Sequence, residues 1–386
     1  MFAYNRIACS AYRSVSKPAR RLLLAASLLA LCLPATSRAS EPTANGPGDT
    51  ALILAGMPPA AGSPLEPLTR TAAFQQHARE FAHSWMRLES GQLSEIREWS
   101  RQQLQPSAST LFYFFSGPDF LYANAFFPRA ETYVMAGLEP VGPIPRVTEA
   151  NIRALSQLRG SLNTIMSYSF FKTAEMRSRF SDGAFTGTLP ILYIFLARSG
   201  ASIEETTLIS LDESGREVAA ASSDARASVN GTKIVFKARD GSRRTLYYFQ
   251  TDISDRGQSV AQLLSFCRGL GKGDALIKSA SYLLHGDNFT KVRDHLLEHT
   301  RTLLQDDSGI PLRHFSEEKW VLTAHGRYVG PISLFARHYQ PQLATLHRRQ
   351  RASALPFGIG YRWRPHESSL LVATRNASRA EQAATN

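Results

Sequence analysis

The sequence has few cysteines and no apolar run long enough to cross a membrane. Only three cysteines occur among its 386 residues, which excludes a small domain held together by a framework of disulfides. No stretch of 18 or more apolar residues is present, which argues against a conventional membrane-spanning helix. With 43% hydrophobic and 20% charged residues, the chain is neither disordered nor collagen-like. It is long enough to bury a large core.

Familiar catalytic and metal-binding motifs are also missing. The sequence contains no H-E-x-x-H, no C-x-x-C, no EF-hand loop, no G-x-G-x-x-G and no P-loop. His295 and His299 lie four residues apart and could share one helix face. Because Val292 and Leu296 mark the inner face of the predicted helix, we expect both histidines to face solvent. We therefore predict no metal site and no cofactor.

The N-terminal segment has the pattern of a secretory signal. Residues 1–21 carry five basic residues and no acid, and residues 22–33 form an apolar run of twelve. Ser37 and Ala39 then place small side chains at the two positions that a signal peptidase reads. A helix of twelve residues spans only about 18 Å, against about 30 Å of bilayer core, so a membrane anchor is less well supported. We predict that residues 1–39 are a signal peptide and that the protein is exported, most simply to the periplasm.

Export would leave a single cysteine in the mature chain. Cys9 and Cys32 belong to the predicted signal, so only Cys267 would remain. It lies in an apolar run, where a buried thiol behaves as a small hydrophobic side chain. We expect no nucleophilic role for it.

Net positive charge is concentrated at the two ends of the sequence. The chain carries a formal net charge of +12, shared equally between the predicted signal and residues 336–386, where eight arginines face two glutamates. Arginine suits bidentate contact with phosphate or carboxylate. For an exported protein the expected partners are anionic lipid, lipopolysaccharide or cell-wall surfaces rather than nucleic acid. The alternative is a solvated basic surface with internal ion pairs. The candidate anion-binding side chains are Arg348, Arg349, Arg351, Arg362 and Arg364.

Composition divides the rest of the chain into three parts. Residues 40–70 are rich in proline, glycine and alanine and predict a linker or an extended arm. Residues 71–335 predict a mixed α/β body. Residues 336–386 predict a basic C-terminal segment with a terminal hairpin, packed on the body.

Periodicity and turn signals predict the elements of the body. Helices are expected at 74–88, 93–104, 120–127, 148–181, 189–198, 258–270 and 287–305. Strands are expected at 111–115, 132–138, 206–211, 232–239, 242–250, 275–284 and 320–322, with a terminal hairpin of 357–363 and 369–373.

Two apolar strands flank a short helix near the middle of the first half. Leu111–Phe115 and Thr132–Leu138 are continuous apolar runs, typical of strands buried on both faces. The helix at 120–127 between them makes a βαβ unit, whose strands run parallel. Asp240-Gly241 between two β-rich runs predicts a tight antiparallel hairpin, because glycine accepts positive φ. The predicted fold is therefore α/β, a mixed sheet with a buried βαβ unit, flanking helices and an antiparallel hairpin part.

Polar residues follow the predicted strands directly, where ligands bind in open α/β sheets. Ser116 and Asp119 follow the first strand, Glu139 follows the second, and His285 follows the segment at 275–284. These four are the candidate catalytic residues. Two carboxylates at one sheet edge could perform acid–base chemistry.

Each of these residues also has a structural interpretation. Ser116 or Asp119 could cap the following helix, and Glu139 could form a salt bridge or a solvated turn. The surroundings of Ser116 lack the G-x-S-x-G pattern of hydrolase nucleophiles. For His285 and the acidic residues that follow it in the sequence, the structural interpretation is capping of the helix after His285 and a turn that closes that helix at residues 306–309.

Three segments resemble a family of uncharacterised exported bacterial proteins. They are Ser116–Ala123 (SGPDFLYA), Tyr133–Gly142 (YVMAGLEPVG) and Gln305–Pro311 (QDDSGIP). The resemblance covers roughly residues 70–375 and implies that these segments form a distinctive surface. It implies no catalytic residue, since that group has no established activity.

The sequence supports two functions of different classes. The first is a non-catalytic binding or envelope-maintenance role, in which the arginine-rich end contacts an anionic surface. The alternative is a hydrolase or transferase with a polar site at the ends of parallel strands, built from Ser116, Asp119, Glu139 and His285.

Overall fold

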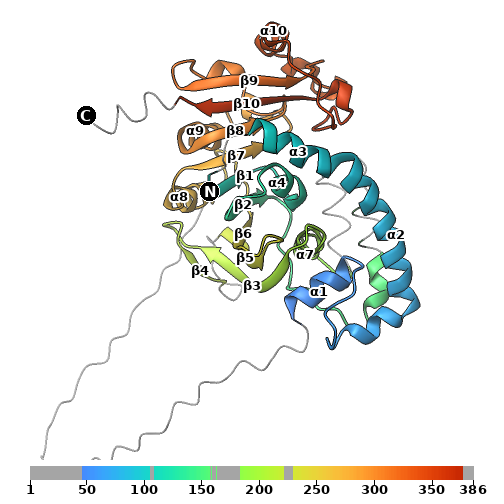
Figure 1. The fold of residues 1–386 in the computed structure, drawn as a ribbon. Helices are drawn as coiled ribbons and strands as arrows, with labels where there is room; N and C mark the ends of the chain where they lie inside the picture. Colours follow the sequence, from blue (N-terminus) through green and yellow to red (C-terminus); the bar gives the residue numbers. More distant parts are fainter. Residues whose placement is uncertain are drawn as a thin grey trace, which may run out of the picture. The chain divides into compact units, whose positions relative to one another are not determined.

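A computed structural model describes residues 46–104, 108–156, 158, 162, 183–220 and 229–376. In this part of the chain, ten strands form one sheet in the order β4-β3-β5-β6-β2-β1-β7-β8-β10-β9, with helices on both of its faces (Figure 1). The strands are β1 (Thr110–Tyr113), β2 (Thr132–Gly137), β3 (Ser202–Leu211), β4 (Glu217–Ala219), β5 (Val229–Lys237), β6 (Arg243–Gln250), β7 (Gly273–Ile277), β8 (Thr300–Gln305), β9 (Trp320–Gly326) and β10 (Ser369–Arg375). The prediction of an α/β fold with a mixed sheet is confirmed.

The helices and short helical turns complete the described elements. The α-helices are α1 (Pro47–Leu54), α2 (Ala72–Leu88), α3 (Ser94–Gln103), α4 (Phe120–Phe126), α7 (Leu189–Arg198), α8 (Val260–Gly269), α9 (Thr290–His299) and α10 (Pro341–Gln350). The short turns are η1 (Glu66–Arg70), η2 (Glu89–Leu93), η3 (Ile152–Ala154), η4 (Leu283–His285), η5 (Leu312–His314), η6 (Ser333–His338) and η7 (Pro365–Glu367). Most of the predicted helix at 148–181 lies outside the described residues. None of the described helices combines the length and the apolar character needed to cross a membrane.

The centre of the sheet is parallel. β1 pairs in parallel with β2 on one side and with β7 on the other, and Leu111 lies opposite Tyr133 in the register. β6 continues the parallel set beside β2, and β8 continues it beside β7. The predicted βαβ unit is thus present, with α4 connecting β1 to β2. The carboxyl ends of these five strands meet at one edge of the sheet.

Alternate residues of the central strands enter two separate cores. Leu111 and Tyr113 of β1 pack on the face covered by α4 and α7. Phe112 and Phe114 pack on the opposite face, beneath α8 and α9. A strand covered on both faces has no polar side to present, which explains the unbroken apolar run at 111–115. The residues that follow each of these strands form the loops at the edge of the sheet.

The predicted hairpin joins β5 to β6. The two strands are antiparallel, and Gly241 occupies the turn with φ of +84°. Its N–H donates to the carbonyl of Ala238 at 2.9 Å. β5 also pairs with β3, so the hairpin extends the sheet away from the parallel centre.

The segment predicted as a linker contains a buried helix instead. α1 occupies Pro47–Leu54, and its Ile53 and Leu54 side chains are fully buried. α1 lies against α7 and β3. Proline is tolerated in the first turn of a helix, so its presence did not exclude one. The composition of residues 40–70 concealed a short apolar helix that covers part of the core.

Two predicted elements near the C-terminus are wrong in their bounds or partners. The helix expected to run to Gln305 ends at His299, and Thr300–Gln305 continues as β8. The terminal hairpin is absent from the described residues, because β10 lies between β8 and β9 and pairs antiparallel with both. The stretch at 357–363 contributes only an isolated bridge between Ile359 and Arg362. The true partners of β10 are distant in sequence, so a local pattern could not reveal them.

Of the two histidines expected at the surface, His295 is buried and His299 is half-buried. His295 is 4% exposed and packs against the rings of Phe112 and Phe114, with His299 stacked on it at 4.5 Å between ring centroids. Among the described residues, neither ring nitrogen of His295 has a hydrogen-bond partner. Burial, followed by the nearby His299 and Arg268, lowers its pKa to about 3.

Replacement of His295 by phenylalanine should reduce the acid sensitivity of the fold. The folded state holds His295 neutral, whereas the unfolded chain takes up a proton near an ordinary pKa of about 6.5. Stability from this group is therefore present above pH 6.5 and is lost as the pH falls toward 3. When the pH is lowered from 7 to 4.5, the free energy of unfolding should fall in both proteins. We expect this decrease to be roughly 2 kcal/mol smaller in His295→Phe than in wild type. Urea unfolding at the two pH values measures this difference. The control is His366→Phe, at an exposed position, and equal losses in His295→Phe and wild type would contradict the prediction.

Candidate functional site

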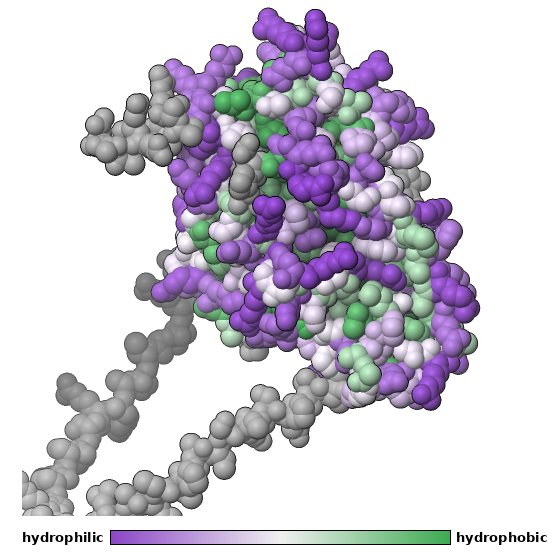
Figure 2. All heavy atoms as spheres, viewed as in Figure 1, coloured by the Kyte–Doolittle hydropathy of each residue, from purple (hydrophilic) through white to green (hydrophobic). Residues whose placement is uncertain are grey.

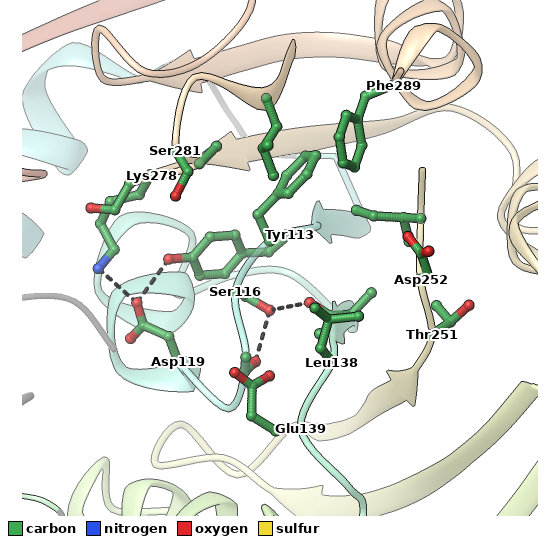
Figure 3. A pocket seen from close by; sticks show the side chains of 18 of the residues that line it. Tyr113, Ser116, Asp119, Leu138, Glu139, Thr251, Asp252, Lys278, Ser281 and Phe289 are labelled. Atoms are coloured by element: carbon green, nitrogen blue, oxygen red, sulfur yellow. Dashed lines mark hydrogen bonds and ion pairs between the residues drawn. The ribbon is translucent and has the colours of Figure 1, made fainter. Parts of the chain in front are cut away.

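A cavity of about 190 Å³ opens at the carboxyl ends of the parallel strands. The loops after β1, β2, β6 and β7 form its wall, together with Phe289 before α9 and Tyr361 from the C-terminal segment (Figure 3). One part of the wall is apolar and includes Leu138, Ile253 and Phe289. The rest carries hydroxyl, carboxylate and ammonium groups. This is the position at which open α/β sheets bind their ligands.

The loop after β1 has a constrained backbone. Phe115 has φ of +61° and Gly117 has φ of +51°, which places both in the left-handed region. This region is costly for a residue with a large side chain such as phenylalanine. Ser116 between them is buried, and its hydroxyl donates to the carbonyls of Gly117 at 2.8 Å and of Ala136 at 3.3 Å. Ser116 therefore ties the loop to β2.

Asp119 begins α4 and joins it to the end of β7. Its Oδ1 accepts a hydrogen bond from the N–H of Tyr122 at 3.4 Å, as a helix cap does. Its Oδ2 lies 2.8 Å from the Nζ of Lys278 and accepts a hydrogen bond from the Tyr113 hydroxyl at 2.8 Å. The Lys278 ammonium also lies 3.9 Å from the centre of the Tyr122 ring. One carboxylate thus connects three elements of the site.

This ion pair is almost completely removed from solvent. The side chains of Asp119 and Lys278 are each 2% exposed. Burial raises the pKa of Asp119, and the adjacent Lys278 opposes that rise. Burial also raises the pKa of Tyr113 well above its usual range, and the Asp119 carboxylate adds to that shift. Tyr113 therefore keeps its proton and donates a hydrogen bond to Asp119.

Glu139 enters the cavity from the loop after β2. It is 4% exposed, and its main-chain carbonyl accepts a hydrogen bond from the Tyr248 hydroxyl at 2.8 Å. The same hydroxyl lies 3.4 Å from Oε2 of Glu139. A side chain on Gly137 would come within 2.4 Å of that Oε2, and one on Gly117 within 3.4 Å. Gly137 therefore leaves the space in which the Glu139 carboxylate lies, whereas a Cβ on Gly117 would be in ordinary contact with it.

The loop after β7 is the most strained part of the site. Ser279, Ser281 and Tyr282 have φ between +52° and +56°. With Phe115 they make four of the five non-glycine residues with positive φ in the described chain, and Arg351 is the fifth. Such conformations persist only when surrounding contacts enforce them, and they concentrate at functional sites.

Side chains from two distant segments hold this loop in place. Asp306 accepts hydrogen bonds from the N–H of Ser279 at 2.8 Å and from the N–H of Ser308 at 2.9 Å. The Ser308 hydroxyl in turn accepts from the N–H of Ala280 at 2.7 Å. The Tyr361 hydroxyl accepts from the N–H of Ser281 and donates to the carbonyl of Ser279. These hydrogen bonds fix the backbone of the loop. The fixed backbone in turn sets the directions of the loop's side chains.

Two buried hydroxyls in the cavity wall have no hydrogen-bond partner among the described residues. They are Oγ1 of Thr251, after β6, and Oγ of Ser279, after β7. Leaving a buried hydroxyl unpaired is unfavourable by about 1–3 kcal/mol. A polar ligand in the cavity would supply the missing partners.

The structure brings together three of the four predicted catalytic residues. Ser116, Asp119 and Glu139 line the same cavity, whereas His285 lies outside its lining. His285 instead lines a separate cavity with Arg313 and His338.

The candidate anion-binding arginines divide into two groups. Arg362 donates to the carbonyls of Gly330 and Pro331, and both Arg362 and Arg364 lie 3.8 Å from Glu367. Arg348, Arg349 and Arg351 are exposed at the end of α10.

Sequence reasoning missed several residues of the cavity. Lys278 and Ser279 follow an apolar strand directly, which is the signal that identified Asp119 and Glu139. They were hidden because residues 275–284 were predicted as one strand, whereas β7 ends at Ile277. Thr251 follows β6 in the same way. Tyr113 gave no signal, because its position in a strand predicts a core side chain.

Neither metal-ligand clusters nor known relatives help to define this site. Within the described ranges, no group of three or more histidine, cysteine, aspartate or glutamate side chains is arranged to hold a metal ion. No protein-family model, curated protein or solved structure matches the chain.

A double-mutant cycle on Asp119 and Lys278 should show strong coupling. Asp119→Asn leaves a buried ammonium without its carboxylate, and Lys278→Met leaves the carboxylate without its cation. Each single change should lower the free energy of unfolding by about 3–5 kcal/mol, since removing one partner strands a buried charge. The double variant should be destabilised by clearly less than the sum of the two.

Denaturant unfolding of the four proteins measures the coupling directly. Asp240→Asn with Arg244→Met provides a matched control pair, in which Asp240 is 58% exposed. Additive effects at Asp119 and Lys278 would mean that the two charges do not depend on each other.

Proposed function

We propose that this protein is an enzyme of the hydrolase or transferase class that acts on a small substrate in the cavity at the ends of β1, β2, β6 and β7. The observation that carries the proposal is the buried Asp119–Lys278 ion pair in the wall of that cavity, with the Glu139 carboxylate in the same wall.

The energetic cost of the site supports a catalytic role. Removing two charges from water costs several kcal/mol per ion, and their mutual attraction does not always recover it. The positive φ angles of Phe115, Ser279 and Ser281 add further unfavourable free energy around the same cavity. A fold gains no stability from concentrating these features in one place. Pre-organised charges and strained backbone are, however, what a catalytic site uses.

The geometry supports separate roles for the charged groups. Glu139 is the candidate general base, which would activate water or an acceptor hydroxyl. The Lys278 ammonium, held by Asp119, would stabilise negative charge that develops on the substrate. Asp119 and Tyr113 then act as positioning residues. The Ser116 hydroxyl donates hydrogen bonds to main-chain carbonyls. These bonds favour a role in holding the loop over a role as nucleophile.

The cavity wall also indicates the kind of substrate. The unpaired hydroxyls of Thr251 and Ser279 would bind polar groups, while Leu138, Ile253 and Phe289 would contact apolar ones. At about 190 Å³ the cavity is smaller than the roughly 300–1,000 Å³ typical of sites for drug-sized molecules. The substrate is therefore a small amphipathic molecule, or the small end group of a larger one. The signal-like N-terminal sequence would place this activity in the cell envelope.

A panel of chromogenic substrates tests the proposal. We expect wild-type protein to turn over at least one of p-nitrophenyl acetate, p-nitrophenyl phosphate and p-nitrophenyl glucoside. Glu139→Gln should lower the rate by about 10²–10⁴-fold, the usual contribution of a general base. Leu138 lines the cavity and is 50% exposed, so Leu138→Trp should obstruct entry without disturbing the core.

The matched control is Leu334→Trp, at a position that is 77% exposed and outside the cavity lining. It should keep the wild-type rate. Turnover that Glu139→Gln and Leu138→Trp leave unchanged, or an absence of turnover in wild type across the panel, would count against the proposal.

A second candidate function is contact between the arginine-rich end and an anionic envelope surface. Arg348, Arg349 and Arg351 are exposed within four residues, and none of them forms a salt bridge within the described residues. The region around α10 is strongly hydrophilic in Figure 2. Cationic side chains also stabilise the C-terminal end of a helix, so their position alone does not require a partner.

Vesicle sedimentation tests this second function. Protein should bind phosphatidylglycerol vesicles at low salt and be released at high salt, because exposed charges are screened over about 8–10 Å at physiological ionic strength. Replacing Arg348, Arg349 and Arg351 by alanine should remove most of the bound fraction. The control replaces three exposed arginines elsewhere, namely Arg79, Arg87 and Arg129. Equal retention of the two triple variants would refute a specific role for the end of α10.

A further inference from the structure

A second cavity, of about 230 Å³, adjoins the end of η4, whereas the first cavity adjoins its start. Leu283, at the start of η4, lines the first cavity, and His285, at its end, lines the second. Three further segments complete the second wall, and each supplies a polar side chain. They contribute Arg313 from η5, Arg337 and His338 from η6, and Gln340 and Gln342 from the start of α10.

The wall of this cavity is basic. Arg313 and Arg337 carry full positive charges, His285 and His338 lie beside them, and no acidic residue is among the described residues of the lining. Arg313 donates to the main-chain carbonyl of His285 at 2.8 Å, and Arg337 donates to Nε2 of His338 at 3.2 Å. Neither arginine forms a salt bridge within the described ranges. Two guanidinium groups thus share one cavity without a counter-charge.

His285 adds an unused polar atom to this wall. Its Nε2 is buried and has no hydrogen-bond partner among the described residues. The ring is held edge-on to the rings of Tyr282 and His338, at 5.1 and 5.0 Å between centroids. Burial, followed by the neighbouring His338 and Arg313, lowers the pKa of His285 to about 4, while a hydrogen bond to the main chain of Asp307 opposes them. The positive surroundings that disfavour a proton on His285 would favour an anion beside it.

The first turn of α10 reinforces the same preference. α10 has ten residues and begins at Pro341, so the main-chain N–H groups that follow have no partner within the helix. These N–H groups and the helix dipole favour negative charge at this end. Gln340 and Gln342 place this turn in the cavity wall.

We propose that this second cavity is a binding site for a tetrahedral oxyanion, such as the phosphate group of a small metabolite. Arg313 and Arg337 supply the charge, and the unpartnered Nε2 of His285, whose other ring nitrogen bonds the main chain of Asp307, can accept a hydrogen bond from a protonated oxygen of the anion. Because these groups come from three different loops, they approach a central ligand from separate directions. That arrangement suits a phosphate or sulfate better than a planar carboxylate, for which a single guanidinium presents a matching pair of donors.

Calorimetric titration of the full chain with sodium phosphate tests the site, with sodium chloride at equal ionic strength as the reference. Phosphate and sulfate should bind with measurable heat and raise the Tm, whereas acetate should bind at least tenfold more weakly. Arg313→Gln and Arg337→Gln should each weaken phosphate binding by about tenfold or more. Both positions are exposed, so the variants should fold, and Arg348→Gln is the matched control that should bind like wild type.

Three results would overturn the proposal. Sodium chloride could raise the Tm as much as phosphate does, which would show a general salt effect. The Arg313 and Arg337 variants could bind phosphate like wild type, which would place the anion elsewhere. Acetate could bind as tightly as phosphate, which would assign the cavity to carboxylates. Line broadening of the phosphate signal in ³¹P NMR gives an independent measurement for each protein.

Discussion

Parallel pairing of β1 with β2 and with β7 is the constraint on which the candidate site depends. These strands are buried on both faces, so their apolar side chains fix their position in the sheet from two sides. Parallel neighbours end at the same edge, and the loops that follow them must therefore lie together. Asp119, Glu139 and Lys278 come from three such loops, although 139 residues or more separate Lys278 from the other two in sequence. Had any one strand run in the opposite direction, its polar residues would lie at the far edge of the sheet.

The Asp119–Lys278 ion pair makes this convergence specific. Apolar packing positions the strands but does not select one arrangement of the loops beyond them. A buried charge without a partner is far more costly than an exposed one, so each of these residues can be accommodated only where the other lies. The pair therefore fixes the start of α4 against the end of β7. Tyr113, within β1, donates to the same carboxylate and connects that junction to the sheet.

Sequence reasoning recovered the parts of the fold that local patterns determine. The βαβ unit, the β5–β6 hairpin and α7 follow from apolar periodicity and turn residues, which act over a few neighbours. β10 could not be placed in this way, because its partners β8 and β9 begin 69 and 49 residues before it. α1 was concealed by proline and glycine that lie around the helix and in its first turn. His295 was assigned to solvent because a helix in a covered layer buries more than one stripe of its surface.

The candidate site, like the fold, was predictable only where local sequence patterns determine it. Asp119 and Glu139 were found because each follows a strand with a clear end, and Lys278 was lost because the end of β7 was not seen. His285 was associated with them only through that same misplaced strand end. In the structure, the intervening residues Ser279, Ser281 and Tyr282 turn the chain through positive φ, and His285, at the end of η4, lines the second cavity. Tertiary contacts from Asp306, Ser308 and Tyr361 enforce that turn.

The segment from Lys278 to His285 therefore contributes to two cavities of different character. Its first residues face the carboxylates of the cavity at the strand ends, and its last residue faces the arginines of the second cavity. The backbone between them is both strained and held by hydrogen bonds from three side chains. Such strain persists only while the surrounding contacts enforce it, so the placement of Lys278 and of His285 depends on the same hydrogen bonds from Asp306, Ser308 and Tyr361. One short loop therefore places residues in two cavities, and the contacts that hold its backbone position both sets of residues.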